Sequence, residues 1–267
     1  RRRVIDEAGG EVRVYGTPGE EGGENGSAKG SFVREGFFRD VDAALCVHPG
    51  SDHHELTHKE IACAPIRIVF KGKASHASSA PHNGINALDA MILVFNSIGL
   101  LRQQLPQDVR IHGIISKGGD APNIIPDYTE ARFYVRASTV KRMMDVYHKL
   151  ESITEGAALQ TGCTGLLEPT QRNLVDNIIP TPSFDAVYRR VLESLGESFD
   201  DRPPQPLGSS DVGNVSQVIP VIPVMYRPTQ YYQFSTKHWT NFPTEENPYA
   251  PPQILVVAAG VKSLGII

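Results

Sequence analysis

The pattern of apolar residues between positions 66 and 168 constrains the fold of this chain more than any other feature. It alternates between a period of two residues, which is typical of strands, and a spacing of three or four, which is typical of amphipathic helices. The pattern predicts strands at 66–71, 109–116, 128–137 and 161–168, and helices at 87–104 and 140–159. That order is the βαββαβ arrangement of ferredoxin-like domains.

The residues on either side of this region show a second set of strands and helices. We expect strands at 11–15 and 43–47, a helix at 27–38, and a core helix in the apolar tail at 254–267. The sequence therefore predicts an α/β protein in which a βαββαβ domain (62–169) is inserted into a larger α/β domain (1–61 and 170–267). Residues 1–10 resemble the end of a helix that leads directly into a strand, so we expect the larger domain to be incomplete at its N-terminus.

Charge and composition exclude several classes of function. The chain has 26 lysines and arginines against 30 aspartates and glutamates, and its only basic run is at residues 1–3. We therefore expect no nucleic-acid partner. No apolar run reaches the roughly 18 residues that a membrane-spanning helix needs, so we expect no membrane partner. The three cysteines are odd in number and far apart, which favours a reducing compartment and predicts a cytoplasmic protein.

Two adjacent carboxylates, Glu20 and Glu21, follow the first predicted strand in a glycine-rich loop. Such a pair at the end of a strand can supply one ligand for a metal ion and one general base that activates water. The alternative is an acidic turn in contact with solvent, and the pair taken by itself favours that alternative.

Two histidines are candidate metal ligands. His48 ends a run of apolar strand residues, and His238 lies in a polar loop beside Trp239, the single tryptophan. Neutral imidazole is a common zinc ligand, but one histidine at such a position is more often structural or exposed. Together with Glu21 these histidines are widely spaced in sequence. If they bind metal, this spacing is typical of an open catalytic site rather than of a closed structural one.

Three further polar residues lie in the predicted inserted domain. His76 is in a small, polar segment before a long helix, where it could be incidental to the start of that helix. Asn123 lies in a loop rich in glycine and proline, and Arg136 closes a strand, where a surface ion pair is the plain alternative. A loop at 208–213 resembles a helix start, which could bind an anion or be a simple cap. No role is predicted for the remaining histidines, His112 among them.

Several segments, taken in order, resemble the zinc aminoacylase and carboxypeptidase family of metallopeptidases and amidohydrolases. The similarity is strongest to the branch that contains Xaa-Arg dipeptidase, also called β-alanyl-lysine dipeptidase, and it extends to p-aminobenzoyl-glutamate hydrolase. The segments are Tyr-Gly-Thr-Pro at 15–18 with the glutamate pair, His-Pro at 48–49, Gly-Lys-Ala-Ser-His at 72–76, Gly-Ile-Asn-Ala-Leu-Asp-Ala at 84–90, His-Gly-Ile-Ile at 112–115 with Pro-Asn-Ile-Ile-Pro at 122–126, and Gly-Ser-Ser-Asp at 208–211 with Gly-Asn-Val-Ser at 213–216.

The resemblance implies that the protein hydrolyses an amide or peptide bond in dipeptides or N-acyl amino acids. It implies that Glu20 is the general base, which takes a proton from metal-bound water and later gives it to the leaving amine. It further implies two zinc ions, one bound by Glu21 and His238 and the other by His48. Other divalent metals could occupy the same positions.

The resemblance also assigns roles in the inserted domain, which would be a lid and a dimerisation domain. It implies a homodimer in which His76 of one subunit reaches the active site of the other and steadies the tetrahedral intermediate. Asn123 and, thirteen positions later, Arg136 would contact the carboxylate of the substrate.

One feature of the family is missing from this sequence. Members usually supply a first histidine and a bridging ligand from a motif well before the glutamate pair, and no such motif precedes Glu20 here. We therefore expect the chain by itself to be inactive. The alternatives to a hydrolase are a non-catalytic binding or regulatory protein of the same fold and a module for dimerisation alone. The retained residues Glu20, Glu21, His48, His76 and Arg136 favour the hydrolase.

Overall fold

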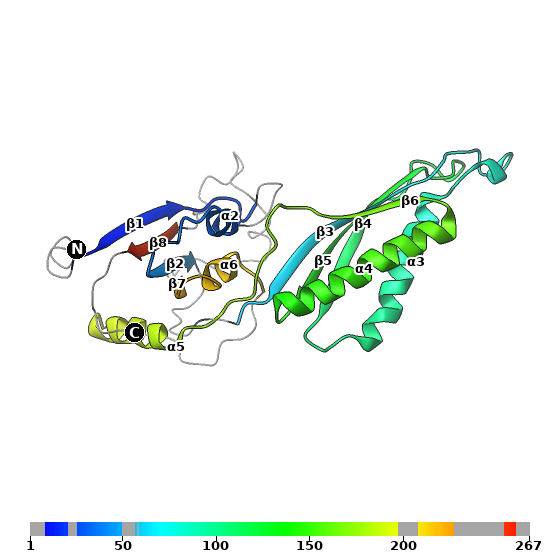
Figure 1. Cartoon of the computed structure of the whole chain (residues 1–267). Helices are drawn as coiled ribbons and strands as arrows, with labels where there is room; N and C mark the ends of the chain where they lie inside the picture. The colour runs from blue at the N-terminus through cyan, green and yellow to red at the C-terminus, as the bar shows by residue number, and fades with distance from the viewer. Residues whose placement is uncertain are drawn as a thin grey trace. The chain divides into compact units, whose positions relative to one another are not determined.

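The computed structural model describes residues 9–20, 26–49, 57, 59–196, 208–226 and 254–259. The chain divides into two compact units. One, the middle unit, is continuous in sequence (Ala62–Leu174), and the other, the split unit, is formed by the two flanking segments (Arg1–Ile61 and Val175–Ile267). Each unit has its own four-stranded sheet and its own hydrophobic core (Figure 1).

The middle unit is an antiparallel sheet with two long helices against one face (Figure 1). Its elements in chain order are β3 (Ala62–Lys71), α3 (Ala87–Leu101), β4 (Arg110–Lys117), β5 (Tyr128–Ala137), α4 (Val140–Thr161) and β6 (Thr164–Pro169). The strands lie in the order β4-β5-β3-β6, and every neighbouring pair is antiparallel. This arrangement confirms the predicted ferredoxin-like βαββαβ fold.

Strand β5 shows how the sequence gives this sheet one covered face and one open face. Ala131, Phe133 and Val135 are buried in the core with residues of both helices. Arg132 and Tyr134, which alternate with them, are exposed. Because successive strand residues point to opposite faces of a sheet, the first set packs against α3 and α4 and the second lies on the open face.

The two long helices begin and end where local chemistry favours it. The side chain of Asn86 accepts a hydrogen bond from the backbone N–H of Leu88 (2.9 Å), and the Thr139 hydroxyl accepts one from Arg142 (3.3 Å), so both act as N-caps. Helix α4 ends at Gly162, whose φ of 74° lies in the left-handed region that glycine adopts without steric cost. No helix in the described ranges is both long enough and apolar enough to cross a bilayer.

The split unit has a mixed sheet with strand order β1-β8-β2-β7. Its elements are β1 (Glu11–Gly16), α2 (Ala28–Arg34), β2 (Ala43–Pro49), α5 (Pro182–Ser194), α6 (Val212–Ser216), β7 (Val221–Tyr226) and β8 (Ile254–Ala259). Strands β2 and β7 are parallel, whereas β8 is antiparallel to both β1 and β2. Strands β1, β2 and β7 therefore run in the same direction, and their carboxyl ends lie at one edge of the sheet.

Two predictions for the split unit are wrong in part. The expected C-terminal helix is, over residues 254–259, strand β8 between β1 and β2. A short apolar run fits a buried strand as well as a buried helix, and its β-branched residues favour the strand. The helix expected at 27–38 extends only over α2, because Gly36, with φ 79°, lies in the left-handed region and interrupts the helical path.

An aromatic cluster fixes β1 against α2 and the segment that follows it. The ring of Tyr15 packs edge-on against those of Phe32, Phe37 and Phe38, with ring centroids 5.5, 6.2 and 5.8 Å away, and its hydroxyl donates to the Phe37 carbonyl oxygen (3.2 Å). Such edge-to-face pairs stabilise beyond the area that they bury. The cluster holds both flanks of the loop that carries Glu20.

Candidate active site

Glu20 and His48 both follow, or end, strands whose carboxyl ends lie at the same edge of the split unit's sheet. In the strand register, Gly16 of β1 and Val47 of β2 are both opposite Ile254 of β8. Because one strand separates them, the two backbones are about 10 Å apart at this level. The crevice at the carboxyl ends of parallel strands is where α/β proteins place their ligands, so this edge is the candidate site.

The loop that carries Glu20 is closed at its base. The backbone N–H of Ser27 donates to the carbonyl oxygen of Gly19 (2.8 Å), which brings the residue before Glu20 next to the start of α2. Ser27 has φ 63°, the single non-glycine residue with positive φ among those described. Left-handed backbone is strained for such a residue and persists where the surroundings fix it, which is typical of functional loops.

A buried ion pair joins α2 to the loop before α6. The Nζ atom of Lys29 lies 2.5 Å from Oδ1 of Asp211, and the backbone N–H of Lys29 donates to Oδ2 (3.2 Å). Neither side chain has exposed area. Burial by itself lowers the pKa of Lys29, but the Asp211 carboxylate outweighs this and raises it, so Lys29 is charged. The 208–213 loop therefore uses its carboxylate to hold Lys29, and α6 is too short to be an anion site.

Two further ionisable groups lie around this ion pair. Burial, and then the negative charge of Glu20, raises the pKa of Glu60 to about 8. The Oε2 atom of Glu60 is buried and has no hydrogen-bond partner among the described residues. Burial raises the pKa of the Cys46 thiol to about 12, although the Lys29 charge opposes the change. Both groups are therefore mostly neutral at pH 7, and Lys29 supplies positive charge beside Glu20.

The predicted metal ligands are described only in part. Glu21 and His238 lie outside the described residues, and only the backbone of His48 is described, as the sixth residue of β2. Among the side chains that the structure describes, no three histidine, cysteine or acidic groups are placed to hold a metal ion. One carboxylate and two imidazoles are donor types that zinc prefers. The donor types of the three predicted ligands therefore fit zinc.

In the middle unit, His76 and Asn123 are brought together. The backbone N–H of Ala77 donates to the carbonyl oxygen of Asn123 (2.9 Å). The Nδ1 atom of His76 accepts hydrogen bonds from the backbone N–H groups of Ser78 and Ser79, both at 3.2 Å. A neutral imidazole whose Nδ1 accepts carries its proton on Nε2. His76 is therefore set up to donate a hydrogen bond from Nε2.

Arg136 lies far from these two residues within the same unit. It is the ninth residue of β5, whereas Asn123 is in the loop that precedes Tyr128, the first residue of that strand. Eight steps along an antiparallel strand extend over about 27 Å. The structure therefore does not bring Asn123 and Arg136 together, and one copy of the chain cannot apply both to the same carboxylate.

Several residues around these positions were not found from the sequence. Lys29 and Asp211 were missed because they are 182 positions apart in the sequence, and Glu60 was missed because it belongs to none of the recognised motifs. The signals were indirect: Asp211 belongs to a matched segment, and Lys29 follows a glycine-rich loop. In the middle unit, His112 and Tyr134 are cross-strand partners next to Arg136, which depends on the register of β4 and β5.

Comparison with known proteins identifies the family of the chain. Residues 57–161 match the family model described as a peptidase dimerisation domain. The chain is 37% identical to Xaa-Arg dipeptidase from Mus musculus over 214 residues, 79% of this chain and 48% of that protein. It is 40% identical to a component of p-aminobenzoyl-glutamate hydrolase from Escherichia coli (strain K12) over 189 residues, 70% of this chain and 38% of that protein. The chain thus spans about half the length, or less, of these curated relatives.

A solved structure agrees with the fold. The aminobenzoyl-glutamate utilization protein from Klebsiella pneumoniae has a TM-score of 0.63 to this chain and is 19% identical to it. The match covers 73% of this chain and 52% of that protein. At this identity the similarity concerns the fold alone. The dimerisation domain, the two curated relatives and the fold all agree: the chain belongs to the M20 family of peptidases and amidohydrolases, the aminoacylase and carboxypeptidase family that its motifs resemble.

Proposed function

We propose that the protein hydrolyses an amide or peptide bond in dipeptides or N-acyl amino acids, with Glu20 as the general base. The observation that carries the proposal is the register of the split unit: Glu20 follows β1, His48 is near the end of β2, and both strands end at one edge of the sheet. Two relatives bear the names of a dipeptidase and an amide hydrolase, which supports the same class of reaction.

The residues that would hold two zinc ions are Glu21 and His238 for one and His48 for the other. Bound zinc supplies a Lewis acid that makes water more acidic and polarises the scissile carbonyl group. Glu20 then takes the proton of the attacking water and returns it to the leaving amine. Its loop is closed by the bond between Ser27 and Gly19, which keeps the carboxylate at the edge of the sheet.

The length of β5 separates the predicted site residues of the middle unit into two groups. His76 and Asn123 lie together before the start of β5, and Arg136 lies eight residues, about 27 Å, along that strand from Tyr128. We therefore assign them to two different active sites of a homodimer. His76 and Asn123 would serve the site of the partner subunit, where His76 donates to the developing oxyanion, and Arg136 would bind the substrate carboxylate in the site of its own chain.

The test uses a chimera in which this chain replaces the matching 214 residues of mouse Xaa-Arg dipeptidase. We expect zinc-dependent hydrolysis of dipeptides that end in arginine or of N-acyl amino acids. Glu20→Gln should abolish turnover and leave the zinc content near normal, whereas Glu21→Gln should lower the zinc content. The exposed Glu35→Gln is the matched control and should change neither. Loss of zinc in Glu20→Gln would show that the two glutamates have the opposite roles. A folded, zinc-loaded chimera without turnover would refute the hydrolase.

A second candidate function, dimerisation, is favoured by the match of residues 57–161 to a peptidase dimerisation domain. Mixing two inactive chimeras, His76→Ala and Glu20→Gln, separates it from catalysis. In a mixed dimer one site has both an intact Glu20 and an intact histidine from its partner, so some activity should return. Dimers that mix without any restored activity would leave dimerisation as the role of this unit.

The compartment is part of the same proposal. Cys46, Cys63 and Cys163 are thiols that form no disulfide with one another, and the first two are buried. Thiols persist in a reducing environment. We therefore place the protein in the cytoplasm, which cell fractionation with an antibody against the chain would test.

A further inference from the structure

Three side chains form a cluster on the open face of the middle unit's sheet. His112 of β4 is directly opposite Tyr134 of β5, and their ring centroids are 5.6 Å apart. The guanidinium carbon of Arg136 lies 5.4 Å from the centroid of the same tyrosine ring. The tyrosine ring therefore has both an imidazole and a guanidinium group beside it.

A second arginine lies next to this cluster. Arg136 is directly opposite Arg110 on β4, and like charges in that position destabilise a sheet. Burial, and then the positive charge of Arg136, lowers the pKa of His112, so the histidine acts as a neutral stacking partner. Two arginines and a neutral imidazole thus lie close together at this end of the face.

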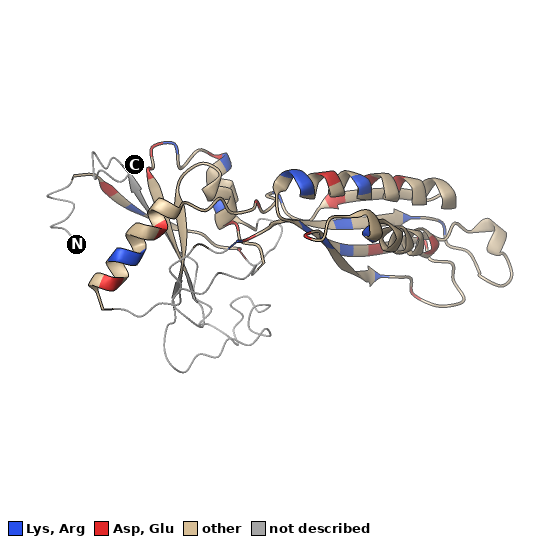
Figure 2. Cartoon of the chain, turned by 90° about the horizontal axis from the view of Figure 1, so that it is seen from below, with Lys and Arg blue, Asp and Glu red and all other residues tan. Residues whose placement is uncertain are grey.

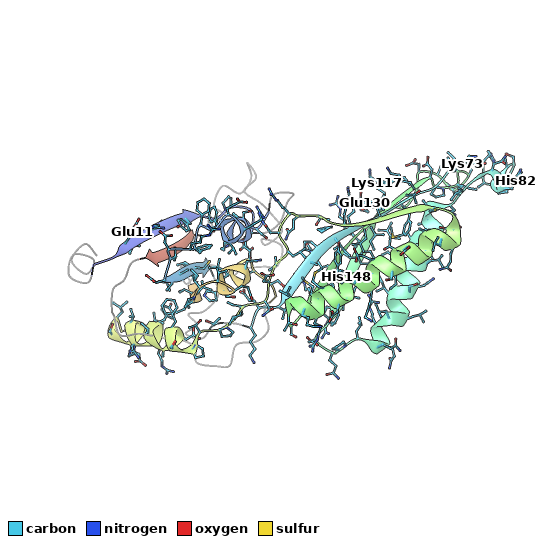
Figure 3. All side chains as sticks on the ribbon, viewed as in Figure 1. Glu11, Lys73, His82, Lys117, Glu130 and His148 are labelled. Atoms are coloured by element: carbon cyan, nitrogen blue, oxygen red, sulfur yellow. The ribbon has the colours of Figure 1, made fainter. Side chains whose placement is uncertain are left out.

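The other end of the same face has a different character. Glu130 and Lys117, labelled in Figure 3, mark that end. There Arg132 donates to Glu130 (3.3 Å), and the cation that lies over Tyr128 is Lys117, 5.5 Å from the ring centroid. Glu130 also accepts a hydrogen bond from the Tyr128 hydroxyl (3.0 Å). Stacking of a cation on tyrosine therefore occurs twice on β5, once beside a carboxylate and once opposite a second arginine.

We propose that Tyr134, supported by His112, is a positioning residue that holds the guanidinium of Arg136 in the orientation that binds the substrate carboxylate. This inference rests on the proposed function, because it takes Arg136 as the carboxylate-binding group. When one face of a guanidinium group lies against an aromatic ring, its N–H groups still point outward in the guanidinium plane. There they can donate to both oxygens of a carboxylate. Without the ring, the arginine side chain would sample many rotamers and bind the same carboxylate more weakly.

The experiment follows the side-chain Nε–Hε signal of Arg136 by NMR in the full chain. The probes are N-benzoylglycine and, as a control, its amide. We expect a saturable shift with the acid and none with the amide. Tyr134→Leu should weaken binding of the acid about three- to thirtyfold, which is the range expected for loss of a cation–π contact. Tyr134→Phe keeps the ring and should stay within about twofold of the unmodified chain.

Two variants on the same strand serve as controls. Tyr128→Leu removes the other cation-stacked tyrosine, and Arg132→Ala removes an exposed arginine on the same face, so neither should change the affinity for the acid. Unchanged affinity in Tyr134→Leu, or an equal loss in Tyr128→Leu, would overturn the inference and leave the role of Arg136 intact. If Arg136 responds to the acid and the amide alike, or to neither, its proposed role as carboxylate ligand fails, and this inference fails with it.

In the active chimera the same variants give a second readout. Tyr134→Leu should raise KM for substrates with a free carboxylate about three- to thirtyfold and leave kcat within about twofold. A substrate whose carboxylate is amidated should be cleaved equally well by both proteins. A fall in kcat at unchanged KM would mean that Tyr134 acts on the reaction itself or on the fold, and would contradict a positioning role.

Discussion

The two units of this protein treat buried charge in opposite ways. The hydrophobic core of the middle unit is formed by apolar side chains, and charged residues of both signs alternate along α4 (Figure 2). The split unit buries Lys29 and Asp211 completely beside Glu60 and Cys46. Buried ion pairs add little net stability over apolar residues of similar volume. We therefore attribute the buried charges of the split unit to its candidate active site, and the apolar core of the middle unit to the stability of its fold.

Two glutamates with little exposure, one in each unit, show the same contrast. The carboxylate of Glu130 in the middle unit accepts hydrogen bonds from Ser116 (2.7 Å), Tyr128 (3.0 Å) and Arg132 (3.3 Å). Glu60 in the split unit has a buried oxygen without a partner among the described residues. A carboxylate that accepts several hydrogen bonds is stable in its charged form, whereas a desolvated one is stable when protonated.

The largest expected effect is on the free energy of unfolding, and it distinguishes the buried ion pair of the split unit from an exposed ion pair of the middle unit. Lys29→Met leaves Asp211 buried without its ion-pair partner, and should lower the free energy of unfolding by about 3–5 kcal/mol. The exposed pair of Lys141 with Asp145 is the matched control, and Lys141→Met should cost no more than about 0.5 kcal/mol. Urea unfolding of both variants measures the difference. The double variant Lys29→Met with Asp211→Leu should recover most of the loss, and a double variant as unstable as the single one would contradict this account.

The next effect compares one glycine in each unit, and replacement by alanine should change the free energy of unfolding in opposite directions. A Cβ atom at Gly213 would lie 1.9 Å from the carbonyl oxygen of Asp176, so Gly213→Ala should destabilise the split unit by about 1–3 kcal/mol. A Cβ at Gly156, inside α4, meets no atom within 4 Å. Gly156→Ala should therefore stabilise the middle unit by up to about 1 kcal/mol. Thermal unfolding followed by circular dichroism tests both, and a stabilising Gly213→Ala would refute the close approach.

The third effect is a dependence of stability on pH that comes from Glu60. Its pKa is raised from an ordinary 4.5 to about 8 in the folded chain, so the folded state keeps a proton that the unfolded state releases. Stability should therefore fall as pH rises from about 4.5 to 8, by roughly 1–2 kcal/mol after allowance for residual solvent contact. Glu60→Gln should remove this part of the slope. Denaturation curves at several pH values, with a chelator present, measure it, and identical slopes would show that Glu60 is charged.

The smallest effect has the opposite sign and belongs to Glu130. Hydrogen bonds, the first from Ser116, lower the pKa of Glu130 below its ordinary 4.5. The folded state therefore binds this proton less readily than the unfolded state. The stability from Glu130 is present above about pH 4.5 and is lost as pH falls through the lower, folded value. Glu130→Gln should flatten the acid side of the curve of stability against pH, and a change on the alkaline side instead would contradict the assignment.

The sequence predicted the middle unit more closely than the split unit for a physical reason. Strand β5 was predicted at 128–137, as observed, because its alternation of apolar and polar residues is a local signal. The conformation of β8 was predicted wrongly, because pairing with β1 and β2, more than 200 positions away in sequence, decides it. Local patterns thus fix the elements whose neighbours are close in the chain.

The same limit applies to the candidate site. Short motifs in the sequence predicted that Glu20 and His48 lie near the ends of strands. That these strands end at the same edge became clear from the structure, in which β1 and β2 run in the same direction. The ion pair of Lys29 with Asp211 could not be predicted, because it joins residues 182 positions apart without any periodic pattern. The separation of Asn123 from Arg136 was also hidden, because a matching spacing in sequence says nothing about distance along an extended strand.

The pairing of β1 with β8 has a consequence for synthesis of the protein in the cell. The middle unit is continuous, so it can fold on the ribosome as soon as β6 has emerged. Strand β1 is made long before, yet its described partner β8 follows 238 positions after its last residue, from Gly16 to Ile254. At roughly 5–20 residues per second, β1 waits on the order of ten to fifty seconds with that edge unpaired. During translation β1 is therefore exposed to chaperones, or to aggregation, while a finished domain lies between it and the strand that will pair with it.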